Sequence, residues 1–523
     1  MIRFLSTRAS ISRYGVPMSV NATSNLALGP YAGWTRERLI ERLMQLECTP
    51  QGTAGPPSLP STNPESSFDF SKHPRRKIAL KFCYSGWEYG GLAHQMGPTP
   101  LPTVENVLFD SMAKAHLIDP TAGLDGCGWE RCGRTDRGVS AAGQVVSLWI
   151  RSQICPVEGH DEEEDPTVEE LGKSVPEGST DDAFGALTLD TDPTSTFTSH
   201  TRDSKPNQEI DYLNVLNRLL PDTIRIIAWS PVSDAFSARF ACKYRHYKYF
   251  FSSLHLDVPR MQAAAPRLLG EHDFRNLCKL DVQKQLTSFK RRILRASITP
   301  LCETDNDGHD KMYVFDLVGT AFLYHQVRHI MAALFLVGSG LEPPEIITEL
   351  MNVEAGAEPI RAEDVANGRP YAVVNSKPDY QMADALPLML WECGYDKSEL
   401  HWRTGGYVDG HNTIKGDLYQ QLGGIYTRSR VYSVLDQHFM TAVGVHHPPL
   451  LKNGAEQLGD NAARERVTNV PLGGGTSKRL QKYKPLLERQ RLDTVEVMNE
   501  RWRLGKGSRR DARRVAAIAD NDE

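Results

Sequence analysis

Residues 132–150 read CGRTDRGVSAAGQVVSLWI, a short charged loop followed at once by an apolar segment. In the loop one carboxylate, Asp136, stands between Arg134 and Arg137, with a glycine on either side of this charged run. The segment Gln144–Ile150 predicts a β-strand, because its β-branched and apolar residues alternate onto one face. A carboxylate held where a loop enters a strand predicts a substrate site, although a plain charged turn would have the same composition.

The strand and helix patterns along the chain predict an α+β fold, an α/β sandwich built from two similar halves. Strand, helix, loop and strand follow one another over residues 76–155, which together with 209–250 form the expected N-terminal half. This half should begin with a strand at Ile78–Tyr84 and continue with a helix after Thr103, whose side chain suits an N-cap. The same alternation over 251–395 predicts a C-terminal half.

The C-terminal half is expected to contain two helices. One covers 259–269, with Pro266 near its end, and a long apolar one covers 321–337. Residues 270–277 predict a turn between them, and 387–393 predict the last strand of the folded core.

Segments outside the two halves differ from them in composition and are expected to be tails, linkers and one insertion. They are 1–75, with a short helix at 35–47; the acidic, disordered insertion 156–208; and the C-terminal extension 396–523, linker-like over 451–476 with a basic tail over 478–514. The tail has thirteen basic and five acidic residues. It is expected to be a solvated arm, although an arm that contacts RNA would have the same composition.

The net charge of −5 conceals a basic body. Residues 156–203 hold fourteen acidic and two basic residues, so the remainder of the chain carries a net charge of +7. A basic body is compatible with a polyanionic partner but does not specify one.

The first 36 residues contain four arginines and no acidic residue, which is typical of a mitochondrial transit peptide, expected over 1–17, or of a disordered tail. Met18 offers a second start, so we expect a cytoplasmic or nuclear form and a mitochondrial pool. No apolar run reaches the ~18 residues of a membrane span, and no membrane partner is expected. The nine cysteines are scattered without a C-x-x-C pair, which favours reduced thiols over disulfides or a zinc site.

Arg328 lies within the most apolar helical segment of the chain, between Val327 and Met331. Arginine is rarely buried without a partner, so this position predicts a carboxylate nearby. Asp136 is the natural candidate, since the pair would orient the carboxylate and favour its ionised form. An arginine that extends to solvent would equally satisfy the pattern.

The strand that begins at Tyr244 alternates two sets of side chains. Tyr244, His246 and Lys248 share one face, while Tyr247 and Tyr249 share the other. For Tyr247 and Tyr249 the pattern favours cross-strand packing. Tyr244, at the end of the strand, is the expected aromatic surface for a base.

Other motifs give little support for a bound cofactor. His325 and His329 have the i, i+4 spacing of metal ligands, but no third ligand or H-E-x-x-H pattern accompanies them. No P-loop, G-x-G-x-x-G or G-x-S-x-G motif occurs. We therefore expect neither a metal nor a nucleotide cofactor.

Four segments, in their order along the chain, resemble the TruA family of tRNA pseudouridine synthases. They are the strand and turn that end at Gln95, the loop Gly133–Val139, the block Phe236–Tyr244 and the segment Ala321–Arg328. Further segments are similar to the eukaryotic branch that acts on tRNA positions 38 and 39, namely Arg131–Cys132, Val139–Ala141, His272–Lys279 and Phe322–Arg328.

This resemblance implies the TruA-type fold, in which the two halves share a mixed, largely antiparallel sheet with flanking helices. It implies that Asp136 is the nucleophile that opens the uridine glycosidic bond, that Tyr244 stacks on the target base and assists proton removal from C5, and that Arg328 pairs with Asp136. Arg134 would help to extrude the target base from its stem. Substrate contacts are also expected for Thr135, Arg137, Phe322 and Leu323.

The implied partner is tRNA, bound at its anticodon stem-loop by a homodimeric enzyme that needs no cofactor. Two alternatives stay open: the same chemistry at other tRNA positions, and a tRNA-binding protein without activity on the same fold. Binding alone would not require Asp136, Tyr244 and Arg328 together, so these residues favour the enzyme.

Overall fold

A computed structural model describes residues 68–95, 97, 99–154, 209–301, 311–367, 370–404, 418–447 and 468–509. The expected transit peptide over 1–17, the short helix at 35–47 and the acidic insertion 156–208 lie outside the described residues. The structure therefore leaves these three predictions untested.

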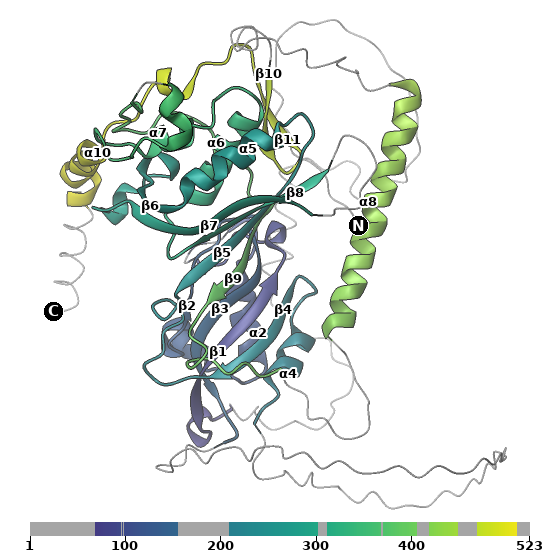
Figure 1. Cartoon of the computed structure of the whole chain (residues 1–523). Coiled ribbons are helices and arrows are strands. Elements are labelled where there is room, and N and C mark those ends of the chain that lie inside the picture. The colour runs from purple at the N-terminus through teal and green to yellow at the C-terminus, as the bar shows by residue number, and fades with distance from the viewer. Residues whose placement is uncertain are drawn as a thin grey trace, which may run out of the picture. The chain divides into compact units, whose positions relative to one another are not determined.

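Nine strands form the central sheet: β1 (Arg75–Tyr84), β2 (Glu130–Arg131), β3 (Ser140–Arg151), β4 (Ile224–Pro231), β5 (Tyr244–Ser252), β6 (Gly270–Asp273), β7 (Lys290–Pro300), β8 (Met312–Gly319) and β9 (Leu388–Gly394). Their order is β4-β1-β3-β9-β5-β8-β7-β6, and β2 pairs with β3 (Figure 1). The pair β3 and β9 is parallel, and the other pairs are antiparallel. This mixed, largely antiparallel sheet confirms the predicted fold class.

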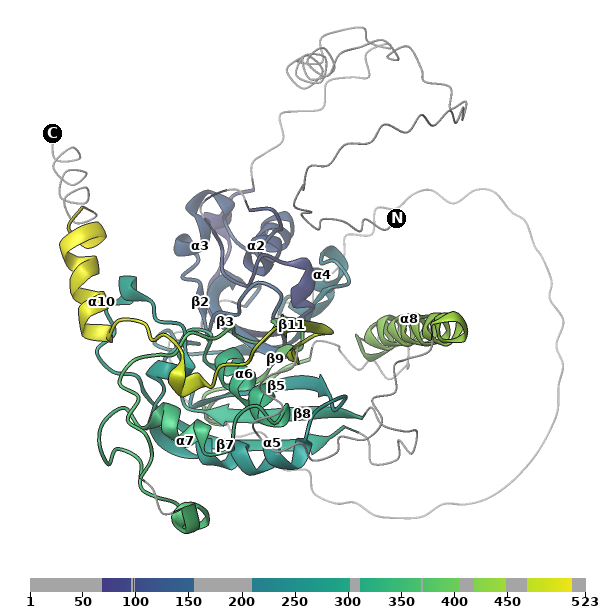
Figure 2. The same ribbon diagram turned by 90° about the horizontal axis from the view of Figure 1, so that it is seen from above.

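The other described elements are helices and a small hairpin: α2 (Val104–Lys114), α3 (Gly123–Gly126), α4 (Tyr212–Leu219), α5 (Val258–Ala264), α6 (Gln326–Gly338), α7 (Ile346–Met351), α8 (Leu418–His446), α10 (Val495–Trp502), β10 (Thr468–Gly473) and β11 (Thr476–Leu480). Helices α2 and α4 accompany strands of the N-terminal half, while α5, α6 and α7 lie together over the C-terminal half (Figures 1 and 2). Among the described helices, none is both long and apolar enough to cross a membrane.

Two hydrophobic clusters form the core, one in each half. Both lie on the same face of the sheet, because a row of cross-strand neighbours joins them. This row runs from Tyr84 to Ala141, to Leu390 and to Tyr247, and cross-strand neighbours project from the same side of a sheet. Tyr247 packs against both clusters. The junction of the two halves therefore lies at the middle of one sheet face.

Helix α2 begins where the sequence predicts. The Thr103 hydroxyl oxygen accepts a hydrogen bond from the Asn106 N–H at 3.3 Å, as an N-cap residue should. The helix predicted over 259–269 is shorter, since α5 ends at Ala264 and a 3₁₀ turn that contains Pro266 follows it.

Helix α6 begins later than predicted. The apolar pattern predicts a helix from residue 321, but the helix starts at Gln326, because His325 adopts a left-handed conformation with φ of 57°. The Gln326 side chain accepts a hydrogen bond from the Leu323 N–H at 2.7 Å. Residues 321–325 therefore form a fixed loop that leads into the helix.

Two further predictions are wrong, one in the C-terminal half and one in the C-terminal extension. Gly270–Asp273, expected in a turn, forms the edge strand β6 against β7. The segment expected to be linker and solvated arm is folded over the described residues 468–509, where apolar side chains are buried: Tyr483 and Leu486 are 2% and 0% exposed and join the C-terminal core. Apolar residues within a basic segment thus decide its structure.

Candidate active site

Asp136 lies in the loop between β2 and β3. The Asp136 carbonyl accepts a hydrogen bond from the Val139 N–H at 3.1 Å, which closes a tight turn. The preceding Thr135 is buried, and its hydroxyl lies 2.6 Å from the Tyr84 hydroxyl in β1. These contacts fix the loop on both sides of the carboxylate, so the Asp136 side chain has a defined position at the middle of the sheet.

Two glycines allow this loop to pack closely. Gly91 has φ of +115°, and a Cβ atom there would lie 3.2 Å from the Thr135 carbonyl oxygen. A Cβ atom on Gly86 would lie only 2.1 Å from the Val139 carbonyl oxygen. Glycine at both positions lets the turn after β1 rest directly on the backbone of the Asp136 loop.

The Asp136 carboxylate faces the N-terminal end of α6. Its Oδ2 atom lies 3.1 Å from His325 Nε2 and 3.7 Å from Arg328 Nη1. The Asp136 side chain is 24% exposed, whereas the two partners are 7% and 12% exposed. The site thus holds a carboxylate that is open to a substrate on one side and bound by two nitrogen groups on the other.

Arg328 confirms the pairing predicted from its position in the apolar helix. Its Nε–H donates to the Ala383 carbonyl at 2.8 Å, and the Ala383 N–H donates to the Arg328 carbonyl at 3.1 Å. These bonds hold the guanidinium toward Asp136, so the arginine does not extend to solvent. At 3.7 Å the pair is an ion pair without a direct hydrogen bond.

His325 is a site residue that the sequence reasoning considered only as a metal ligand. Its left-handed backbone is unusual for a residue other than glycine, and strain of this kind is concentrated at functional sites. Its Nδ1 atom is buried without a hydrogen-bond partner among the described residues, while Nε2 faces the Asp136 carboxylate. An imidazole with its hydrogen on Nε2 donates to Asp136 and leaves Nδ1 as an unused acceptor.

The structure does not bring Tyr244, the expected aromatic surface for the base, to the Asp136 site. Tyr244 projects from the face of β5 opposite to the buried one, where its ring covers Gly394: a Cβ on that glycine would lie 2.1 Å from Tyr244 Cε1. Burial and the nearby Glu392 raise the pKa of Tyr244. The prediction fails because the buried, more apolar face of β5 is the one that carries Tyr247.

Tyr247 is the tyrosine that the fold brings to the site. Its ring meets the Phe322 ring edge to face, with centroids 5.0 Å apart. Burial above all, with Cys393, Cys132 and Asp136 as further causes, raises the pKa of Tyr247 well above its usual range. The phenol is therefore protonated at neutral pH, and its hydroxyl has no hydrogen-bond partner among the described residues. A phenol that lacks a partner beside a carboxylate is available to a substrate.

The other predicted substrate residues divide into two groups. Arg134 and Arg137 are exposed at the loop and form no ion pair with a described residue, so their guanidinium groups are free for a ligand. Phe322 and Leu323 belong to the loop before α6, where Leu323 is 7% exposed. These residues therefore belong to the two separate segments of the chain that meet where His325 contacts Asp136.

His325 and His329, the two histidines with metal-ligand spacing, contact different groups. His329 is buried within α6, and its Nε2 atom lies 3.0 Å from Lys377 Nζ. Burial and the charge of Lys377 lower the pKa of His329 to about 2, so its ring is neutral. Within the described ranges, no three His, Cys, Asp or Glu side chains are arranged to hold a metal ion.

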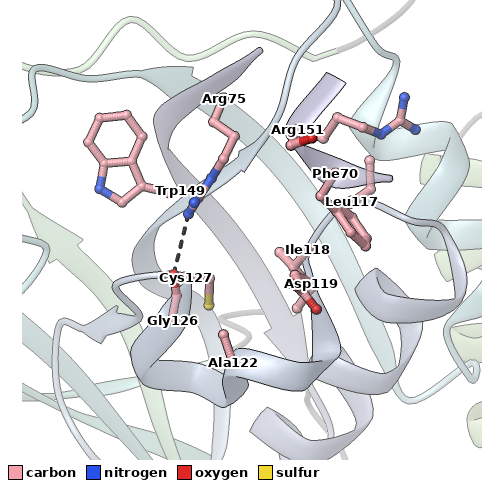
Figure 3. A pocket seen from close by; sticks show the side chains of 11 residues that line it. Phe70, Arg75, Leu117, Ile118, Asp119, Ala122, Gly126, Cys127, Trp149 and Arg151 are labelled. Carbon is pink, nitrogen blue, oxygen red and sulfur yellow. Dashed lines mark hydrogen bonds between the residues drawn. The ribbon is translucent and has the colours of Figure 1, made fainter. Parts of the chain in front are cut away.

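A cavity of about 200 Å³ lies elsewhere, in the N-terminal half (Figure 3). Phe70, Leu117, Cys127 and Trp149 contribute to its lining, and Arg75 Nη2 donates to the Gly126 carbonyl at 3.3 Å at one side. None of the residues around Asp136 lines this cavity. It is therefore separate from the carboxylate site.

Comparisons with known proteins show which proteins this chain is similar to. A family model described as tRNA pseudouridine synthase matches residues 264–396. The tRNA pseudouridine(38/39) synthase of Saccharomyces cerevisiae is 35% identical over 498 residues, which are 92% of this chain and 93% of the yeast protein. The human tRNA pseudouridine(38/39) synthase is 38% identical over 334 residues, 63% of this chain and 58% of its own length. The tRNA pseudouridine synthase A of Methanothrix thermoacetophila is 28% identical over 334 residues, 64% of this chain and 87% of its own.

Proposed function

This chain belongs to the TruA-type family of tRNA pseudouridine synthases, and on this premise we propose that it isomerises uridine to pseudouridine at positions 38 and 39 of tRNA, in the anticodon stem-loop. The observation that carries the proposal is the carboxylate of Asp136, which is fixed by its loop, paired with His325 and Arg328, and open to solvent on one side. Similarity to the yeast protein over nearly the whole of both chains supports the two positions.

Asp136 is the proposed nucleophile. One carboxylate oxygen attacks C1′ of the target nucleotide while the N1–C1′ bond breaks, and the electron pair of that bond stays with the uracil ring. After the ring turns, C5 bonds to C1′ and the aspartate leaves with the electrons of its own bond. The C5 proton is then lost and N1 gains a proton, so the reaction rearranges one nucleotide without a redox step or a second substrate.

His325 and Arg328 are the proposed positioning residues for this carboxylate. Both approach the same oxygen, Oδ2, at 3.1 and 3.7 Å. This arrangement leaves Oδ1 with the freer lone pairs and supports attack by that atom. Because the histidine is held by its backbone and the arginine by Ala383, neither must reorganise when the substrate arrives.

Tyr247 replaces Tyr244 as the proposed tyrosine of the reaction. Its protonated hydroxyl lacks a described partner, and the Asp136 charge contributes to the raised pKa of the phenol. A phenol near the uracil ring can exchange a proton with it as C5 loses its hydrogen and N1 gains one. Phe322, which meets the Tyr247 ring, supplies an apolar contact for the base.

The exposed arginines of the loop are the proposed tRNA contacts closest to the nucleophile. A paired nucleotide must leave its stem before C1′ and C5 can be reached, and this extrusion leaves a gap and a bent phosphate backbone. Arg134 and Arg137 offer two unpaired guanidinium groups beside Asp136, and the body of the chain is basic. These features support a role in holding the opened stem-loop.

We propose that the enzyme is a homodimer, and helix α8 supports this. None of its residues is buried. It exposes eleven large apolar side chains, including Tyr432 and Phe439, and it has few charged residues. A helix that exposes this many apolar side chains is stabilised by a partner that covers them. An antiparallel second copy would set Arg430 against Asp436 of its partner twice, whereas a parallel copy would oppose like charges.

Solution mass tests the dimer. Full-length protein should have twice the mass of one chain by light scattering, and Phe439→Asp should reduce it to one chain. Exchanging the charges with Arg430→Asp should weaken the dimer, and adding Asp436→Arg should restore it. A wild-type monomer at micromolar concentration, or a dimer that Phe439→Asp leaves intact, would overturn this assignment of α8.

We also propose that the protein is found in the cytoplasm or the nucleus and that a further pool of it is in mitochondria. Three arginines and no acid in residues 1–17 support the pool. Protein that starts at Met18 should be lost from purified mitochondria and retained elsewhere. Unchanged fractionation would contradict this proposal.

Pseudouridine mapping of tRNA tests the proposed function. Cells that lack the protein should lose pseudouridine at positions 38 and 39, and wild type should restore it whereas Asp136→Ala should not. If both modifications persisted in the deletion strain, the assigned substrate positions would be wrong. Restoration by Asp136→Ala would instead retain the substrate and refute the nucleophile, and loss at other positions only would favour a different set of sites.

A further inference from the structure

Tyr324 is an exposed aromatic residue at the site that the proposed reaction does not use. Its side chain is 39% exposed, and its ring centroid lies 3.8 Å from that of His325, with the two planes 38° apart. Burial, and then the charge of Asp136, raise the pKa of Tyr324. The phenol ring is therefore at the rim of the site, next to the histidine that contacts the nucleophile.

Two lysines from another segment lie over this ring. Lys279 Nζ is 5.5 Å and Lys284 Nζ is 5.2 Å from the Tyr324 ring centroid. Both side chains are exposed. The Lys279 N–H donates to the Tyr324 carbonyl at 2.9 Å, so the backbone holds the two segments together. Lys284 also forms an exposed ion pair with Asp281 at 3.4 Å, and the group keeps an excess of positive charge.

We propose that Tyr324, Lys279 and Lys284 form a second nucleotide subsite, which takes the nucleotide adjacent to the target uridine. The neighbouring base stacks on the Tyr324 ring, and its phosphodiester lies between the two lysines. This proposal rests on the proposed function, because it needs an RNA strand whose target nucleotide is already at Asp136.

The chemistry of the three side chains fits this ligand. An exposed aromatic ring is a stacking surface for any base, since every base has a π face. A lysine over an exposed ring is held weakly, so phosphate oxygens can replace the ring as its partner. When the target nucleotide leaves the stem, its neighbour loses a stacking partner, and Tyr324 offers a replacement next to the nucleophile.

The position of the lysines gives the subsite a role in substrate choice. Lys279 ends the run His272–Lys279, and Tyr324 belongs to Phe322–Arg328, two of the four segments that resemble the branch acting on positions 38 and 39. Most other residues of these two segments are buried, whereas Lys279 and Tyr324 are exposed. Contacts to the neighbouring nucleotide give Lys279 and Tyr324 a role that bond breakage does not require.

Tyr324 variants test the stacking part of the proposal with full-length protein and a tRNA transcript. Tyr324→Leu removes the ring and should weaken tRNA binding by about tenfold. Tyr324→Phe keeps the ring and should bind as wild type does. If Tyr324 only supported His325, Tyr324→Leu would slow single-turnover conversion without weakening binding, and this result would overturn the subsite.

The lysines are tested by the salt dependence of binding. The double variant Lys279→Ala with Lys284→Ala should bind tRNA more weakly. The slope of log affinity against log salt concentration should become shallower, by an amount that corresponds to about one to two phosphate contacts. Lys114→Ala, an exposed lysine of α2, is the matched control and should leave the slope unchanged. An unchanged slope in the double variant, or an equal change in the control, would contradict a phosphate contact at this place.

The same experiment separates this proposal from the one on which it rests. If wild type forms no pseudouridine in the transcript, the proposed function fails. If wild type is active and Tyr324→Leu binds tRNA normally, the subsite alone fails.

Discussion

The central sheet carries two histidine–aspartate pairs, one on each face. On the face covered by helices, His325 Nε2 lies 3.1 Å from Asp136 Oδ2, with Arg328 near the same oxygen. On the opposite face, His246 Nε2 lies 2.6 Å from Asp316 Oδ1, and Lys248 Nζ and Arg295 Nη2 lie 3.7 and 3.9 Å from that oxygen. A tyrosine accompanies each pair.

The two pairs differ in how many partners their polar atoms have. Asp316 lies within strand β8 and has three nitrogen partners, so its charge is balanced within the sheet. Asp136 lies in a loop and has two nitrogen partners, its side chain is 24% exposed against 14% for Asp316, and His325 Nδ1 remains without a described partner. Polar residues gathered on a sheet thus do not by themselves make a site. A site also needs polar atoms that lack partners and are held in place by a rigid support.

The largest expected effect comes from the two aspartates. Asp136→Asn should slow single-turnover pseudouridine formation by at least about 10⁴-fold, because the amide cannot attack C1′. Asp316→Asn, a matched change on the opposite face, should remain within about threefold of wild type. Comparable losses in both variants, with both proteins folded by circular dichroism, would show that the comparison is mistaken.

The two histidines should differ less. His325→Ala should lower the single-turnover rate by about 10- to 100-fold with tRNA affinity retained, because the carboxylate loses a positioning contact but keeps Arg328. His246→Ala should leave the rate unchanged. Weaker tRNA binding at a normal rate in His325→Ala would mean that this residue contacts RNA and does not position Asp136.

The smallest effect concerns stability and is confined to the opposite face. Burial alone would raise the pKa of Asp316, but the hydrogen bond from His246 and the charges of Lys248 and Arg295 outweigh it and lower the pKa below 3.8. Since the folded pKa is lower than the unfolded one, the stabilisation is present at neutral pH and is lost as the pH falls through the folded value. Asp316→Asn should therefore lower the free energy of unfolding by about 1 kcal/mol at pH 7.

Denaturant titrations of wild type and Asp316→Asn measure this difference. The gap between them should close as the pH falls below about 4. A gap of the same size at low pH would show that packing, and not the charge of Asp316, is what the variant loses.

Much of the fold can be predicted from local pattern, because the strands and helices of the two halves are strongly periodic. The strand β1, the cap of α2 and the apolar residues of α6 follow directly from spacing. Details that depend on tertiary contacts escape such reasoning. The late start of α6 depends on the backbone of His325, and the folding of the segment around Tyr483 depends on a core supplied by other elements.

The site shows the same limit. Arg328 and Asp136 could be paired from sequence, since a buried arginine requires a carboxylate. The choice between Tyr244 and Tyr247 could not be made from alternation alone, because a period of two separates the faces of a strand without saying which one is covered. The buried apolar residues that share a face with Tyr247 were the available signal. The signals at His325 were its i, i+4 spacing with His329 and its place in the segment Phe322–Arg328, and neither indicated a contact with Asp136.

The most direct test of the claim that catalysis belongs to the helix-covered face is the single-turnover rate of Tyr247→Phe against that of Tyr244→Phe. Each change removes one hydroxyl from the same strand and keeps the ring. We predict that Tyr247→Phe slows pseudouridine formation by roughly 10²- to 10⁴-fold, the scale of a lost proton-transfer group, while Tyr244→Phe stays within about threefold of wild type. The reverse order, with Tyr244→Phe impaired and Tyr247→Phe active, would contradict the account.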